Sequence, residues 1–142
     1  MGKYDKLING VSLIELPKIL DERGNLSFFE QEEHVPFVIK RTYWIYDVPG
    51  GSTRGGHAFL QQNEFIVALS GSFDILLFDG NSEQLVSLNR SYHGLYIPNM
   101  VWRQMVNFST NSLALVVSST LYDPDDYIYN KDTFLQLLDV EK

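Results

Sequence analysis

Residues 51–71 read GSTRGGHAFLQQNEFIVALSG, and this stretch decides the fold. A glycine-rich turn precedes His57, an alternating segment leads to Phe59, and Glu64 opens an apolar run that ends at Gly71. Short runs of this kind, separated by turn residues, are typical of β-strands joined by tight connections. Because side chains alternate along a strand, His57 and Phe59 are predicted to share one face.

Short apolar runs separated by turn residues also occur in the rest of the chain. Apolar, β-branched and aromatic runs are separated by turn signals, and we expect strands at 37–46, 64–69, 73–78, 95–97 and 113–118. Asp79-Gly80 lies between two of these runs and predicts a hairpin turn. The sequence therefore predicts an all-β sandwich or barrel.

Near the C-terminus, from Asp123 onward, the sequence pattern is different. Asp123-Pro124 is typical of a helix N-cap followed by proline at the first helical position. Phe134, Leu135 and Leu138 recur with roughly helical spacing. One or two short helices are expected here, on the outside of the barrel.

Composition limits the function. We expect 142 residues with 44% hydrophobic side chains to form one domain, residues 1–142. A net charge of −7 without basic runs argues against nucleic-acid binding, and no apolar run is long enough for a membrane helix. No cysteine and no signal peptide are present, so we expect a cytoplasmic protein without disulfides or thiolate ligands.

One predicted strand carries polar groups on an apolar face. In the segment 37–46, Arg41 and Tyr43 share a face with Phe37, Ile39 and Ile45. Burying an arginine and a tyrosine without partners is costly. Two readings stay open at this point: an exposed edge or satisfied polar cluster, and a ligand cavity into which both side chains point.

The spacing Gly51-x5-His57-x-Phe59-x4-Glu64-x6-Gly71 resembles the first signature of the cupin barrels. In those barrels a second histidine stands at the position of Phe59, and the metal is held by two histidines and a glutamate. The second signature resembles Pro98-x-Met100-x2-Arg103-x3-Asn107, with Arg103 at its histidine position. The resemblance implies a jelly-roll barrel. Because arginine and phenylalanine are not metal ligands, we expect this barrel to hold no metal and no cofactor.

Further motifs, in order, resemble the dTDP-sugar 3,4-ketoisomerases, cupin-fold enzymes of deoxysugar biosynthesis. The resemblance is carried by these segments: Asp21-x-Arg23-Gly24-x-Leu26, Pro36-Phe37-x-Ile39-Lys40-Arg41-x-Tyr43, Arg54-Gly55-x-His57-Ala58, Gly94-Leu95-Tyr96-Ile97-Pro98, Val101-Trp102 and Tyr122-Asp123-x-x-Asp126-Tyr127-Ile128. It implies conversion of a dTDP-4-keto-6-deoxyhexose to its 3-keto isomer.

The resemblance also implies roles for individual residues. His57 would be the general base and Tyr43 its proton-transfer partner. Arg23, Arg41 and Arg54 would meet the nucleotide and diphosphate, and Tyr96 would lie in the sugar pocket. Trp102 could stack on a planar base or a sugar face, and Arg103 could stabilise an enediolate or bind phosphate. The resemblance also implies a homodimer.

Two other functions stay open. The chain departs from the family at Phe59 and Arg103, so a degenerate barrel that binds a nucleotide sugar without turnover is one alternative. A different sugar-nucleotide epimerase, with His57 paired to Glu64 or Asp74, is the other. Glu64 could also be a solvated carboxylate at a strand end. The nucleotide base and the gluco or galacto configuration of the product are not determined by the sequence.

Overall fold

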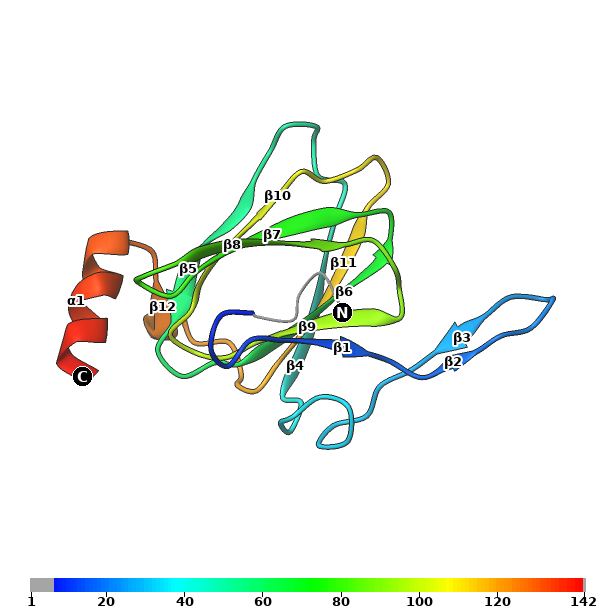
Figure 1. Cartoon of the computed structure of the whole chain (residues 1–142), viewed down its shortest axis with the longest axis horizontal. Helices are drawn as coiled ribbons and strands as arrows, with labels where there is room; N and C mark the ends of the chain where they lie inside the picture. Colours follow the sequence, from blue (N-terminus) through cyan, green and yellow to red (C-terminus); the bar gives the residue numbers. More distant parts are fainter. Residues whose placement is uncertain (1–6, 142) are drawn as a thin grey trace.

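The computed structural model describes residues 7–141 and folds them into two five-stranded antiparallel sheets that face each other (Figure 1). The first sheet has the order β1 (Ser12–Glu15), β9 (His93–Ile97), β6 (Glu64–Ser70), β11 (Leu113–Ser118) and β4 (Arg41–Tyr46). The second has the order β12 (Tyr127–Ile128), β5 (Arg54–Phe59), β10 (Trp102–Val106), β7 (Phe73–Phe78) and β8 (Glu83–Leu88). The predicted all-β jelly-roll class is confirmed, and the ends of the predicted domain, residues 1–6 and 142, lie outside the described residues.

Because side chains alternate between the two faces of each strand, the buried apolar residues form separate clusters on the inner and outer faces of the sheets. Inward side chains such as Ile66, Leu95 and Met105 fill the space between the sheets. Outward side chains of the first sheet, such as Phe65, pack under the segment around Phe37. Each sheet is thus covered on both faces over part of its area, which keeps the strands that carry the pocket rigid.

The C-terminal segment covers the outer face of the second sheet. A 3₁₀ turn spans Pro124–Asp126, and the side chain of Asp123 caps it by accepting a hydrogen bond from the backbone N–H of Asp125. Helix α1 (Lys131–Glu141) follows, and its Phe134 packs with Trp102 and Ala58. The expected short helical elements are therefore present.

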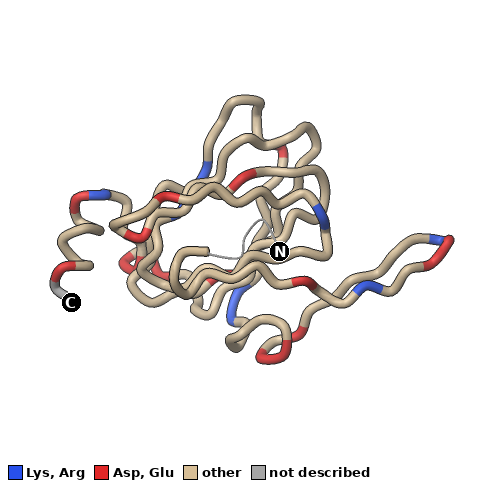
Figure 2. The backbone as a smooth tube through the Cα atoms, in the orientation of Figure 1, with Lys and Arg blue, Asp and Glu red and all other residues tan. Residues whose placement is uncertain are grey.

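A two-stranded hairpin, β2 (Lys18–Ile19) and β3 (Leu26–Ser27), projects away from the body of the molecule (Figure 1). Its turn carries Arg23, which pairs with Asp21 at 2.9 Å. Figure 2 shows that basic and acidic residues lie side by side at the tip of this hairpin. Ile19, Leu20 and Leu26 are more than half exposed on it.

Several strands differ from the sequence expectation. The strand predicted over 37–46 begins only at Arg41, because Pro36 has no N–H and the N–H of Glu32 bonds to the carbonyls of Val35 and Phe37 in a local loop. Strands β1, β8 and β10 were not predicted, since their mixed polar and apolar residues give a weak pattern. No helix among the described residues is long and apolar enough to cross a membrane.

Candidate active site

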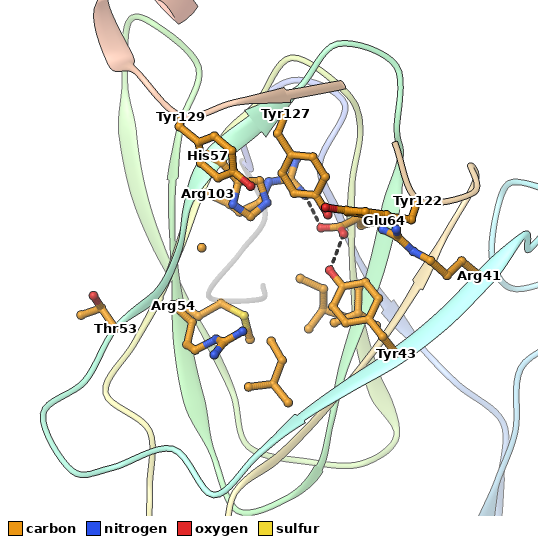
Figure 3. A pocket seen from close by; sticks show the side chains of 15 residues that line it. Arg41, Tyr43, Thr53, Arg54, His57, Glu64, Arg103, Tyr122, Tyr127 and Tyr129 are labelled. Carbon is orange, nitrogen blue, oxygen red and sulfur yellow. Dashed lines mark hydrogen bonds and ion pairs between the residues drawn. The ribbon is translucent and has the colours of Figure 1, made fainter. Parts of the chain in front are cut away.

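A cavity of about 710 Å³ opens between the two sheets (Figure 3). Strands β4, β5, β6, β10 and β11 contribute its walls, and the segment 122–129 closes one side. On β4, Arg41 and Tyr43 point into this space while Trp44 and Tyr46 on the opposite face are exposed. The cavity interpretation of that strand is thus the one that the geometry favours.

His57 enters the cavity from a bulge in β5. The register with β10 shifts between Arg103 and Gln104, where Gly55 and Gly56 have positive φ values of 96° and 63°. A Cβ atom at Gly55 would lie 3.3 Å from the carbonyl oxygen of Arg103, so this position favours glycine for conformation and for space. The bulge directs the His57 ring toward the cavity.

The environment of His57 suits a neutral base. Burial and the nearby Arg103 guanidinium lower the pKa of His57, against the opposing effects of a backbone hydrogen bond with Gly55 and the Glu64 carboxylate. Its Nε2 atom is buried and has no hydrogen-bond partner among the described residues, and the His57 ring lines the cavity. A neutral imidazole with one free nitrogen at a cavity wall can take a proton from a bound molecule.

Glu64 is the centre of a buried hydrogen-bond network. Its Oε2 accepts from the Tyr43 hydroxyl at 2.7 Å, and its Oε1 accepts from Arg103 at 2.6 Å (Figure 3). The same Oε2 also accepts from the Gln62 amide at 2.7 Å. The side chain is only 2% exposed. The reading of Glu64 as a solvated carboxylate at a strand end is therefore wrong, because β6 turns it inward rather than to solvent.

Arg103 stands at the histidine position of the second cupin-like motif. Its guanidinium pairs with Glu64, donates to the carbonyl of Val101 at 3.0 Å and lies 5.0 Å from the centroid of the Phe59 ring. Of the four ligand positions only His57 and Glu64 carry donors, and the described residues contain no group of three potential metal ligands. Two donors facing a fixed cation do not fit a divalent metal.

Tyr43 is held as a protonated phenol. Burial, followed by the Glu64 carboxylate beside it, raises the pKa of Tyr43 far above its ordinary value. Its hydroxyl hydrogen is directed at Glu64, so the oxygen lone pairs remain available to the cavity.

The charge of the cavity is opposite in sign to the charge of the chain. Three arginines, Arg41, Arg54 and Arg103, and a single carboxylate, Glu64, are the charged groups of the lining. Arg41 contacts the rings of Tyr43 and Tyr122 and donates to Gln62 at 3.2 Å, while its Nε is buried without a partner. A cavity with this excess of fixed positive charge favours an anion in a protein whose net charge is −7.

An aromatic wall faces His57. Tyr127 lies 5.2 Å from its ring centroid and stacks on Tyr129, and Tyr122 lies beside them (Figure 3). The sequence pattern placed Tyr122 and Tyr127 only in a C-terminal motif and did not point to Tyr129, because no periodicity links a segment 65 or more residues away to His57. The antiparallel pairing of β12 with β5 brings them there.

Three residues that were expected at the site lie outside this cavity. Tyr96 alternates with the inward Leu95 and Ile97 and packs against Phe37 on the outer face of the first sheet. Trp102 alternates with the inward Arg103 and packs under α1. Arg23 is at the tip of the projecting hairpin, 89% exposed, and does not reach the cavity of its own chain.

The chain is similar to a known family and to several characterised proteins. The model of the family FdtA, described as WxcM-like, C-terminal, matches residues 9–139. TDP-4-oxo-6-deoxy-alpha-D-glucose-3,4-oxoisomerase of Aneurinibacillus thermoaerophilus is 39% identical over 86% of this chain and 88% of its own. The TDP-quinovose 3,4-ketoisomerase WlaRB of Campylobacter jejuni is 41% identical and superposes with a TM-score of 0.87, over 91% of this chain and 99% of its own.

A structure with bound ligand is similar over nearly the whole chain. It is a mutant of the 3,4-ketoisomerase QdtA of Thermoanaerobacterium thermosaccharolyticum in complex with TDP-4-keto-6-deoxyglucose. The two proteins share 35% identity and a TM-score of 0.90, over 92% of this chain and 95% of the other.

Proposed function

Since the chain belongs to the FdtA family of WxcM-like C-terminal domains, we propose that it is a sugar-nucleotide 3,4-ketoisomerase. It converts a dTDP-4-keto-6-deoxyhexose to the 3-keto isomer through an enediol, in deoxysugar biosynthesis. The activity belongs to one domain, residues 1–142. The observation that carries the proposal is the unpartnered, buried Nε2 of His57 at the wall of a cationic cavity.

The carbon chemistry needs one base. The proton on C3 is acidic because the neighbouring C4 ketone can become an enolate. His57 removes that proton from C3 and returns it to C4, and a general base of this kind contributes about 10²–10⁴ in rate. The Arg103 guanidinium beside the ring favours the neutral, proton-accepting form and supplies positive charge near the developing oxyanion.

The nucleotide is held by fixed cations. Arg41 and Arg54 enter the cavity from β4 and β5, and guanidinium groups bind phosphate oxygens through paired donors. The tyrosine wall of Tyr122, Tyr127 and Tyr129 offers flat faces for a sugar or a base. The ligand is thus an anionic nucleotide sugar bound without a metal or a cofactor.

The protein functions as a homodimer in this proposal. The β2–β3 hairpin exposes Ile19, Leu20 and Leu26, and an isolated two-stranded hairpin gains little stability by itself. A second copy would cover these side chains. It would also give Arg23 a role that its own chain does not offer, because the hairpin could carry it to the cavity of the partner.

The test is incubation with dTDP-4-keto-6-deoxyglucose in deuterated water, followed by NMR of the sugar protons. The expected result is a 3-keto product with deuterium at the exchanged carbon. Binding of the nucleotide sugar with neither isomerisation nor exchange would instead support the catalytically degenerate binding barrel. Inversion at a carbon without migration of the ketone would support an epimerase.

A further inference from the structure

Isomerisation also moves a proton between two oxygens, and His57 does not account for it. The substrate begins with a hydroxyl on C3 and a ketone on C4, and the product has these groups exchanged. One proton must therefore leave O3 and one must reach O4. Phe59 occupies the position of the second cupin histidine and has no group that can transfer a proton.

The structure offers one connected pair of proton-transfer groups on the wall other than His57. The Tyr43 hydroxyl points at Glu64 with an oxygen–oxygen distance of 2.7 Å, and both residues line the cavity. We propose that Glu64 is the proton acceptor behind Tyr43, and that this pair carries the oxygen-side proton transfer in place of the missing histidine. The inference rests on the proposed ketoisomerase function and adds a residue to it.

The proton balance closes over one turnover. After His57 has taken the C3 proton, Tyr43 accepts the O3 proton while its own hydroxyl proton shifts to Glu64. Tyr43 then gives a proton to O4, and Glu64 returns its proton to Tyr43. His57 finally delivers its proton to C4. One O–H bond breaks at O3, one forms at O4, and all three side chains regain their starting state.

The surroundings of Glu64 fit a transient acceptor. Arg103 bonds to Oε1 at 2.6 Å, so Oε2 is the oxygen that faces the Tyr43 hydroxyl and receives its proton. Gln62 donates to Oε2 at 2.7 Å, and its own Oε1 accepts from Thr120 and Arg41. The hydrogen bonds from Arg103 and Gln62 fix the orientation of the Glu64 carboxylate relative to the Tyr43 hydroxyl. Glu64 acts through Tyr43 and is therefore a positioning residue with a proton-transfer role.

The experiment separates the carbon step from the oxygen step. Glu64→Gln keeps the shape of the side chain and removes its basicity, and Glu64→Asp keeps the negative charge opposite Arg103 but withdraws the carboxylate by one methylene from both Tyr43 and Arg103. Isomerisation and C3 deuterium exchange are measured for both by NMR. We expect isomerisation per folded protein to fall about 100-fold while exchange stays within a few-fold of wild type, with circular dichroism measuring the folded fraction because Glu64→Gln leaves Arg103 without its counter-charge. Glu83→Gln, an exposed glutamate on β8, is the matched control and should change neither rate.

A double variant tests the route through Tyr43. If Glu64 acts through that hydroxyl, Tyr43→Phe/Glu64→Gln should isomerise within about three-fold of Tyr43→Phe alone, because coupled residues are not additive. Normal isomerisation in Glu64→Gln would overturn the inference, as would parallel loss of exchange and isomerisation in both Glu64 variants. A wild-type protein that neither exchanges nor isomerises would overturn the proposed function itself, and this inference with it.

Discussion

Replacing Arg103 by methionine should destabilise the protein strongly at neutral pH. The substitution preserves most of the side-chain volume but removes the cation from a pair in which both side chains are 2% exposed. Glu64 then stays buried beside Tyr43 and Gln62 without a counter-charge. Removing one partner of a buried ion pair costs about 3–5 kcal/mol, whereas removing both together costs much less.

The expected loss is large enough for simple assays. For a chain of this length, about 3–5 kcal/mol corresponds to a fall in Tm of roughly 10–20 °C. The double variant Arg103→Met/Glu64→Gln should recover most of it, because glutamine still accepts from Tyr43 and no buried charge remains. A residual cost of about 1–3 kcal/mol is expected from the carbonyls of Val101 and Pro98, which lose their donor.

Thermal and urea unfolding followed by circular dichroism measure these differences. Arg90→Met serves as the control, since Arg90 is exposed and its guanidinium donates to the neighbouring carbonyl of Asn89, and it should stay within about 0.5 kcal/mol of wild type. If Arg103→Met is as stable as this control, or if the double variant is no more stable than Arg103→Met, the ion pair is not the buried centre described above.

The remaining predictions concern the residues of the site and the dimer. His57→Asn should abolish isomerisation and deuterium exchange while leaving dTDP affinity within a few-fold in calorimetry, and near-normal turnover would exclude His57 as the base. Because burial and Arg103 lower the pKa of His57, kcat/KM should fall only as the pH drops below the ordinary range of histidine near 6.5, and a rate already falling above pH 7 would contradict this. Phe59→His should not raise turnover, because Arg103 packs over that ring and Glu64 is already engaged, and a faster variant would show that a shuttle had merely been lost. Light scattering should give a dimer mass, and mixing Arg23→Ala with His57→Asn protein should restore activity only if Arg23 serves the partner's cavity.

The amino-acid sequence was enough to predict the all-β fold class and the candidate base His57 in the cupin-like motif. Turn residues and period-two alternation are local properties, so the strands Phe73–Phe78 and Leu113–Ser118 could be predicted with their correct ends. The identities of Phe59 and Arg103 were enough to predict that a metal would be poorly held. His57 could be predicted as the candidate base from its place in the motif.

Which polar side chains contact one another in the cavity could be learned from the tertiary structure alone. Pairing of β10 with β5, and of β11 with β6 and β4, brings Arg103, Glu64 and Tyr43 into one network from segments 21 to 60 residues apart. Nothing in a local pattern records which sheet face a residue such as Tyr96 or Trp102 will present, because a shift of one residue in register reverses it. The role of Glu64 and the tyrosine wall therefore followed from strand register rather than from composition or spacing.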